Sequence, residues 1–243
     1  MDNGNIKGIL ILAAGYGSRM KPITLSTPKP MIKIWNEPII ERLLKQLNTI
    51  FPTIPITINV SHLSEEIIKF CLKIPIQNRP EIIFEFEPQG TLSSIINYSK
   101  KIDGMIAVFH GDLIIDIEGL SNFKKYVDER VDSIIVVHAR NLSSARSIIE
   151  ISNSDKVISV IEIKKSEKVR SVEEFVFSNS GIYFLDSNQI KNFPIKKDES
   201  ISPILLNWIA KKYSLRSYVW EGRRYSLESI NDINEINLIE KFF

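Results

Sequence analysis

The stretch KGILILAAGYGSRMKPITLSTPKPMI, residues 7–32, joins an apolar run to a glycine-rich loop and a series of prolines. The run KGILILA, residues 7–13, ends in small residues and glycine, which is typical of a buried central strand followed by a turn. A helix is not expected to follow directly, because Pro22, Pro28 and Pro30 would interrupt it. The loop is therefore predicted to stay irregular at the carboxyl end of this strand.

Helix and strand patterns alternate after the loop. They predict a helix over 39–50, a strand over 55–60, a helix over 64–73, a strand over 81–87, a helix over 91–101 and a strand over 105–110. The strand over 81–87 alternates, with Ile82, Phe84 and Phe86 on one face. This order is typical of a parallel sheet with helices on both faces.

The second half of the chain has more strand patterns. It predicts a helix near 120–129, strands near 131–139, 148–151, 157–163 and 175–184, a helix starting at Ser202-Pro203, a strand near 215–220 and a helix near 230–242. We expect a single α/β domain over residues 1–243, with a Rossmann-like, mixed and mainly parallel central sheet flanked by helices.

The composition indicates a soluble globular protein. Of the 243 residues, 44% are hydrophobic and 25% are charged, and the formal net charge is +2. Lysine pairs are scattered rather than clustered, which argues against a nucleic-acid partner. No apolar run reaches the roughly 18 residues of a membrane span, and the N-terminus does not resemble a signal peptide. The single cysteine, Cys71, precludes an internal disulfide, so a cytoplasmic location is expected.

The glycine-rich loop allows four interpretations. A dinucleotide fingerprint needs a third glycine where Met20 stands, after Gly15 and Gly17, and a P-loop needs a final glycine-lysine-serine/threonine that is absent. A glycine-rich turn whose basic residues only face water remains the simplest alternative. The fourth interpretation is a phosphate site.

Basic residues favour the phosphate site. Arg19, Lys21 and Lys29 follow a central strand at its carboxyl end, where open α/β sheets bind ligands. Glycines let backbone N–H groups approach a phosphate closely, and the cations supply positive charge. The loop is therefore predicted to bind a polyphosphate.

The segment LAAGYGSRMKPITLSTPKP, residues 12–30, resembles the signature loop of the sugar-1-phosphate nucleotidyltransferases. The resemblance implies the nucleotide-diphospho-sugar transferase fold and Mg²⁺-dependent transfer of NMP from an NTP to a sugar-1-phosphate, with pyrophosphate as the second product. It implies catalytic roles for Arg19 on the β,γ-phosphates and for Lys29 on the α-phosphate. It also implies that the nucleotide is bound by Leu12, Ala13, Ala14, Gly15, Gly17 and Ser18.

Two further segments match the family. The segment EPQGT, residues 87–91, is similar to a family segment over the nucleotide, which implies that Glu87, Gly90 and Thr91 bind it; as a local pattern it is a turn into a helix. In the segment HGD, residues 110–112, the aspartate either caps a turn or, as the resemblance implies, binds Mg²⁺. Asp112 is accordingly predicted to be a metal ligand.

The second half is expected to bind the acceptor, so the resemblance implies a nucleotide-binding half over about 1–115 and an acceptor-binding half over about 116–243. The segment VISVIEIKKSEK, residues 157–168, is similar to a family strand ending in Glu-Lys-Pro, which implies acceptor contacts by Glu162 and Lys164; Lys165 fits equally and the proline is missing. The segment NSGIY similarly implies that Asn179 and Gly181 line the acceptor pocket. The alternative for both segments is a strand with a charged exposed edge.

One segment departs from the family pattern. Ser226 stands where many family members carry a second metal-binding aspartate, and Glu228, two residues on, is predicted to replace it. The alternatives are that the metal keeps more waters or that catalysis is impaired. Choline-phosphate cytidylyltransferases carry an acidic residue close to the Glu228 position, so a non-sugar phosphate such as phosphocholine remains an alternative acceptor. A non-catalytic nucleotide-binding homologue is a further alternative. The base, the acceptor and the oligomeric state stay open, with a homo-oligomer as one option.

Overall fold

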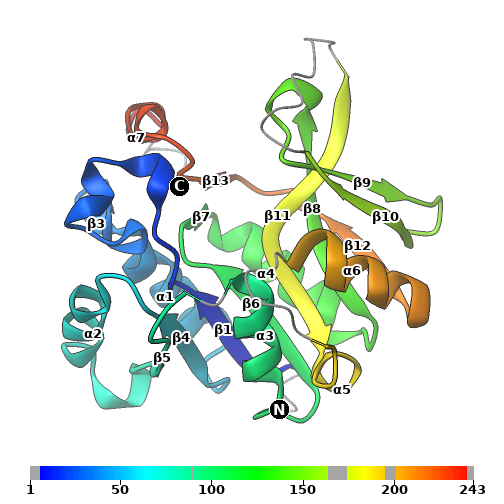
Figure 1. Cartoon of the computed structure of the whole chain (residues 1–243), viewed down its shortest axis with the longest axis horizontal. Coiled ribbons are helices and arrows are strands. Elements are labelled where there is room, and N and C mark those ends of the chain that lie inside the picture. Colours follow the sequence, from blue (N-terminus) through cyan, green and yellow to red (C-terminus); the bar gives the residue numbers. More distant parts are fainter. Residues whose placement is uncertain (1–5, 89, 164–173, 195–200, 240–243) are drawn as a thin grey trace.

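The protein has one large central sheet in a computed structural model that describes residues 6–88, 90–163, 174–194 and 201–239 (Figure 1). Its seven strands lie in the order β12-β8-β11-β6-β1-β4-β5. They span Ile6–Leu12 (β1), Ile56–Val60 (β4), Glu81–Phe84 (β5), Met105–His110 (β6), Ser133–Asn141 (β8), Phe175–Asp186 (β11) and Leu215–Val219 (β12).

Strand β11 runs antiparallel to both of its neighbours, β6 and β8, whereas the other neighbouring pairs of this sheet are parallel. The sheet is therefore mixed and mainly parallel, as the sequence predicts. The parallel strands β1 and β6 end side by side, with Leu12 in register with His110. Residues that follow these two strands consequently meet at one edge of the sheet.

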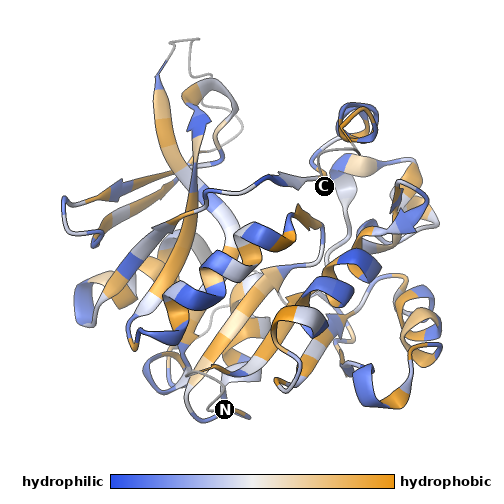
Figure 2. Ribbon diagram, turned by 180° about the vertical axis from the view of Figure 1, so that it is seen from behind, coloured by the Kyte–Doolittle hydropathy of each residue, from blue (hydrophilic) through white to orange (hydrophobic). Residues whose placement is uncertain are grey.

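Helices cover both faces of the sheet. They span Ile39–Ile50 (α1), Ser64–Leu72 (α2), Thr91–Ser99 (α3), Ile117–Asp128 (α4), Ser187–Ile190 (α5), Ile201–Lys212 (α6) and Ile230–Asn237 (α7). Helices α1, α2 and α4 pack with Ile9 and Ile11 of β1, whereas α3, α5 and α6 pack with Leu10. Alternate residues of β1 thus face opposite halves of the core, because side chains alternate along a strand. Figure 2 shows the central strands as mostly hydrophobic and the outer helix faces as hydrophilic.

Short elements complete the fold. Two-stranded sheets pair β9 (Ser147–Ile151) with β10 (Val157–Glu162), β7 (Leu113–Ile115) with β13 (Arg224–Ser226), and β2 (Lys33–Ile34) with β3 (Glu37–Pro38). Short 3₁₀ helices span Ser18–Met20, Ile23–Leu25, Lys29–Met31, Ile76–Asn78 and Leu142–Ser144. No helix in the described ranges is long and apolar enough to cross a membrane.

The loop after β1 has the irregular form that its prolines predict, because it contains only single 3₁₀ turns before α1 begins at Ile39. Gly17 has a left-handed backbone, with φ of 60°. A Cβ atom there would lie 2.9 Å from the Thr24 side chain. Glycine is therefore needed at this position for both conformation and space.

Two predicted elements differ in detail from the structure. Strand β5 ends at Phe84 rather than at residue 87. Phe84 and Phe86 are both exposed, whereas Glu85 between them is buried. Helix α4 starts at Ile117 rather than near 120, because the Asp116 carboxylate accepts the Gly119 N–H at 2.7 Å and so caps an earlier turn.

Candidate functional site

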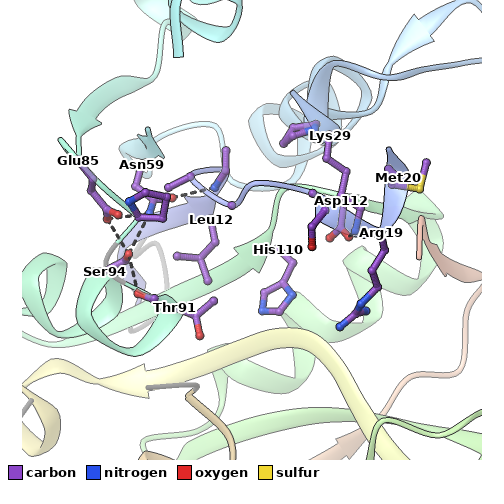
Figure 3. Close-up of a pocket in the computed structure, with 18 residues that line it drawn as sticks. Leu12, Arg19, Met20, Lys29, Asn59, Glu85, Thr91, Ser94, His110 and Asp112 are labelled. Carbon is purple, nitrogen blue, oxygen red and sulfur yellow. Dashed lines mark hydrogen bonds and ion pairs between the residues drawn. The ribbon is translucent and has the colours of Figure 1, made fainter. Parts of the chain in front are cut away.

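A cavity of about 400 Å³ opens at the carboxyl ends of β1 and β6. Its walls come from the loop after β1, the segment after β6, the N-terminal turn of α3 and the ends of β4 and β5 (Figure 3). The structure brings most of the predicted nucleotide-site and metal-site residues together in this lining: Leu12, Ala13, Ala14, Gly15, Gly17, Ser18, Arg19, Lys29, Gly90, Thr91 and Asp112. Glu87 is not part of the lining. The roles of these residues stay predictions.

One end of the cavity is charged. The ammonium group of Lys29 donates to Oδ2 of Asp112, which joins the proline-rich loop to the end of β6. Burial alone would raise the pKa of Asp112, but the charge of Lys29, together with the Lys29 hydrogen bond and the charge of Arg224, holds it below its usual value. Asp112 is therefore an ionised carboxylate with a cationic partner at neutral pH.

Arg224 interacts electrostatically with Asp112 at this end. Its Nε atom donates to the Ser180 carbonyl at 2.8 Å. Burial lowers the pKa of Arg224 to about 10, and the nearby Asp112 carboxylate opposes that shift. The guanidinium consequently keeps its charge at neutral pH and adds positive charge near the Asp112 carboxylate.

The opposite end holds a buried polar network that the sequence analysis did not single out. Asn59 accepts the Ala13 N–H at 2.8 Å and donates to Glu85 at 2.9 Å and to Ser94 at 3.0 Å. The Ser94 hydroxyl donates to the same Glu85 oxygen at 2.6 Å. Figure 3 shows this network and the Lys29–Asp112 pair at opposite ends, with Leu12 and His110 between them. The signal in the sequence is an asparagine inside the apolar run ITINV.

His110 separates the two ends. Burial lowers the pKa of its imidazole, so the ring is neutral near pH 7. Its Nε2 atom is buried without a hydrogen-bond partner among the described residues. A Cβ atom on Gly181, whose φ is +73°, would lie 3.0 Å from the ring. The predicted acceptor residue Gly181 thus provides space for His110, and neither it nor Asn179 lines the two cavities described here.

A second cavity, of about 580 Å³, is lined mainly by residues from the second half of the chain. Its lining includes Arg19, Arg146, Glu162 and Asn207, together with apolar residues of β10. Glu162 therefore faces a cavity as predicted for an acceptor residue, whereas Lys164 lies outside the described residues. Arg19 lines both cavities and so marks the boundary between them.

Glu228 lines neither cavity itself, but it contacts the lining residues Arg19 and Arg146. Its carboxylate accepts from Arg140 at 2.9 Å and from Arg146 at 2.8 Å, and Arg19 lies 4.0 Å away. Burial would raise the pKa of Glu228, but the hydrogen bonds from Arg146 and Arg140 lower it. The β7–β13 register pairs Ser226, not Glu228, with the neighbour of Asp112, Leu113. A metal role for Glu228 stays a prediction, and it would require these ion pairs to break.

Comparisons with known proteins place these features in a family. A family model described as nucleotidyl transferase matches residues 8–220. The UTP–glucose-1-phosphate uridylyltransferase of Synechocystis sp. is 28% identical over 201 residues, covering 76% of this chain and 50% of that protein. The chain spans about half the length of the curated relatives it matches.

Two solved structures share the fold. A UDP-glucose pyrophosphorylase complexed with UDP-glucose superimposes with a TM-score of 0.79 at 18% identity, covering 97% of this chain and 98% of that chain. A CTP:phosphocholine cytidylyltransferase from Streptococcus pneumoniae gives a TM-score of 0.72 at 18% identity, with coverage of 97% and 99%. Because the family model covers most of the sequence and includes the cavity-lining loop, the chain belongs to the nucleotidyl transferase family.

Proposed function

We propose that this chain transfers a nucleoside monophosphate from an NTP to a sugar-1-phosphate, giving a nucleotide sugar and pyrophosphate. The observation that carries the proposal is the Lys29–Asp112 ion pair at the charged end of the first cavity. Arg19 connects that cavity with the second one. Two adjoining cavities with cations at their junction suit a reaction that brings two polyanions together.

The shape of the first cavity supports an orientation for the nucleotide. Its polar network of Asn59, Glu85 and Ser94 can face a base, whereas Lys29 and Arg19 at the other end suit phosphates. The lining of the first cavity ends at Asp112, and the second cavity is lined by Arg19 and by residues from Arg146 onward. This division supports a nucleotide-binding half over about 1–115 and an acceptor-binding half over about 116–243.

The chemistry needs no nucleophilic side chain. An oxygen of the acceptor phosphate attacks the α-phosphorus, the bond from that phosphorus to the bridging oxygen breaks, and pyrophosphate leaves with the electron pair. The attacking phosphate is already ionised, so no side chain has to remove a proton, and positioning and charge neutralisation are the main tasks. We assign Lys29 to the α-phosphate and Arg19 to the departing β,γ-phosphates. The ion pair with Asp112 keeps the Lys29 ammonium in the cavity before substrate arrives.

Mg²⁺ is the cofactor that this proposal requires. Mg²⁺ takes one or two protein carboxylates and fills its other positions with water and phosphate oxygens. The described residues hold no cluster of three or more His, Cys, Asp or Glu side chains, but the ionised Asp112 fits that limited requirement. When bound there, Mg²⁺ would neutralise phosphate charge. Asp112 would hold the ion, and Lys29 would bind the α-phosphate.

A non-sugar phosphate, such as phosphocholine, is the second candidate acceptor. Two departures from the pattern of the sugar enzymes favour it. Ser226 pairs with Leu113, the neighbour of Asp112, and Glu228 is bound by two arginines. The reaction would be the same, with CTP as the donor.

The test is pyrophosphate release by the purified protein with Mg²⁺, crossing the common NTPs and dTTP with sugar-1-phosphates, phosphocholine and other small phosphates. We expect release with one donor class and one acceptor class, and its loss in Asp112→Asn. Asp103→Asn, an exposed aspartate outside both cavities, is the matched control. Release that depends on no acceptor would contradict the proposal. NTP binding without release in any combination would instead indicate a non-catalytic homologue.

A further inference from the structure

Three arginines converge on one carboxylate between the two cavities. The Arg140 Nη1 atom donates to Oε1 of Glu228 at 2.9 Å, and the Arg146 Nε atom donates to Oε2 at 2.8 Å. Arg19 Nη1 lies 4.0 Å from Oε2. We refer to Arg19, Arg140 and Arg146 as the arginine cluster. Since three guanidinium groups surround one carboxylate, positive charge remains in excess.

Fold stability does not account for this arrangement. The side chains of Arg19 and Arg146 are each 52% exposed, and that of Arg140 is 29% exposed. The ion pairs of the two half-exposed arginines, Arg19 and Arg146, contribute little to stability, because water screens them and ordering long side chains costs entropy. Concentrated and accessible guanidinium groups are, by contrast, suited to bidentate binding of a phosphate.

The position of the cluster suits the phosphate of the acceptor. Arg146 lines the second cavity and Arg19 lines both cavities. A phosphate that reaches from the second cavity towards the Lys29–Asp112 pair would therefore meet Arg19 and Arg146, and displacing Glu228 would also free Arg140 to bind it. The carboxylate of Glu228 accepts hydrogen bonds from the guanidinium groups of Arg140 and Arg146, which such a phosphate would otherwise accept.

The Glu228 side chain can move away from the arginines without a change in the backbone. Asp232 accepts the backbone N–H groups of Glu228 at 2.6 Å and of Ser229 at 2.7 Å, which fixes the start of α7. The carboxylate itself is held only through its two arginine hydrogen bonds and the longer Arg19 contact in the described structure. Rotation of this side chain would expose the arginines while α7 stays in place.

We propose that the arginine cluster binds the phosphate of the acceptor, and that Glu228 is an internal carboxylate that occupies this site until the acceptor displaces it. This inference rests on the proposed nucleotidyl transfer. It adds Arg140 and Arg146 to the acceptor site and gives Glu228 a role other than metal binding. It also predicts that the acceptor must bring an anionic group strong enough to replace a carboxylate on two guanidinium groups.

The first test uses binding of inorganic phosphate, measured by titration calorimetry on the protein saturated with a non-hydrolysable NTP analogue and Mg²⁺. We expect Glu228→Gln to bind phosphate about five- to tenfold more tightly, because the competing charge is gone. Arg140→Gln and Arg146→Gln should each bind it at least about tenfold more weakly. Glu235→Gln, an exposed residue of α7, and Arg216→Gln, which pairs with Asp132 outside both cavities, are the matched controls.

The second test measures the acceptor KM at saturating NTP. Glu228→Gln should lower this KM and Arg146→Gln should raise it, while the affinity for the NTP analogue stays at the wild-type level in Arg146→Gln. A raised acceptor KM in Glu228→Gln would show that Glu228 only positions the arginines and would overturn the proposal. A lower kcat with a raised Mg²⁺ requirement would overturn it in favour of a metal ligand.

The two tests separate this inference from the proposed function. If wild-type protein releases no pyrophosphate with any acceptor, the proposed function fails, yet the phosphate titration still reports on the cluster. If turnover occurs but the arginine variants bind phosphate as wild type does, only this inference fails. The exposure of Arg146 makes a folding defect in its variant unexpected, and thermal unfolding of each variant checks this point.

Discussion

The ammonium group of Lys29 contacts the carboxylate of Asp112, and this ion pair joins positions 83 residues apart in the sequence. Lys29 comes from the proline-rich loop and Asp112 from the turn after β6. Their meeting follows from the parallel register of β1 and β6, which brings the segments after both strands to one edge of the sheet. A cation and a carboxylate are thereby fixed beside one another where the phosphates of a nucleotide are proposed to lie.

Lys29→Ala is expected to reduce turnover by at least about 10²–10³-fold, because a preorganised charge at the reacting phosphate is lost. The fold should remain, as judged by circular dichroism and thermal unfolding. Lys33→Ala, an exposed lysine of β2, should keep wild-type turnover. Wild-type turnover in Lys29→Ala would disprove the assigned role.

Asp112→Asn is expected to change how stability depends on pH. The pKa of Asp112 is lowered from 3.8 in the folded protein, so its stabilising contribution is fully present above the unfolded-state value. That contribution is lost as the pH falls through the lower folded-state pKa. Urea unfolding between about pH 2 and pH 7 should therefore show a smaller loss of stability at acid pH in Asp112→Asn than in the wild type. Parallel curves would contradict the assigned environment.

Substituting alanine for Gly17 and for Gly15 should have different effects on the free energy of unfolding. Gly17 has a φ of 60° and no room for a Cβ atom, so Gly17→Ala should lower the free energy of unfolding by about 1–3 kcal/mol. Gly15 has no heavy atom within 4 Å of an added Cβ, so Gly15→Ala should change stability by less than about 0.5 kcal/mol. Equal effects on denaturant unfolding would contradict the loop conformation.

The buried network of Asn59, Glu85 and Ser94 should contribute both to the stability of the fold and to nucleotide binding. Ser94→Ala removes a hydroxyl that donates to Glu85 at 2.6 Å, which should cost about 1–3 kcal/mol of stability. It should also weaken NTP binding, because the network holds Asn59 against the Ala13 N–H. Ser93→Ala removes a neighbouring buried hydroxyl outside the cavity lining and is the control for equilibrium NTP titration. Wild-type NTP affinity in Ser94→Ala would exclude this coupling.

Local patterns and the family resemblance together predicted the residues of the charged end of the site. Pro22, Pro28 and Pro30 excluded a helix, and Asp112 followed a recognisable apolar strand, so both elements could be assigned from short segments. The polar network was harder to predict, because alternation placed Glu85 only on the strand face opposite Ile82, Phe84 and Phe86, and nothing marked it as buried. The chain leaves that strand at Phe84, and Glu85 turns inward to Asn59 and Ser94.

Local sequence patterns could not predict the long-range ion pairs of Glu228. Arg140 and Arg146 lie 88 and 82 residues from Glu228, and no periodicity marks either arginine. Their meeting depends on how the end of β8, the start of β9 and the turn after β13 approach one another. The sequence resemblance led to a metal role for Glu228, because a motif supplies positions but not the partners that tertiary structure brings to them.

The most direct test of the central claim follows the α-phosphate of the NTP. Protein, Mg²⁺, α-phosphate-labelled NTP and the acceptor panel are incubated together, and the labelled products are separated. We predict that the label appears in an acceptor conjugate in amounts equal to the pyrophosphate released, with Lys29→Ala and Asp112→Asn producing almost none. Label recovered only as intact NTP, or as free NMP whatever acceptor is present, would contradict nucleotidyl transfer by this site.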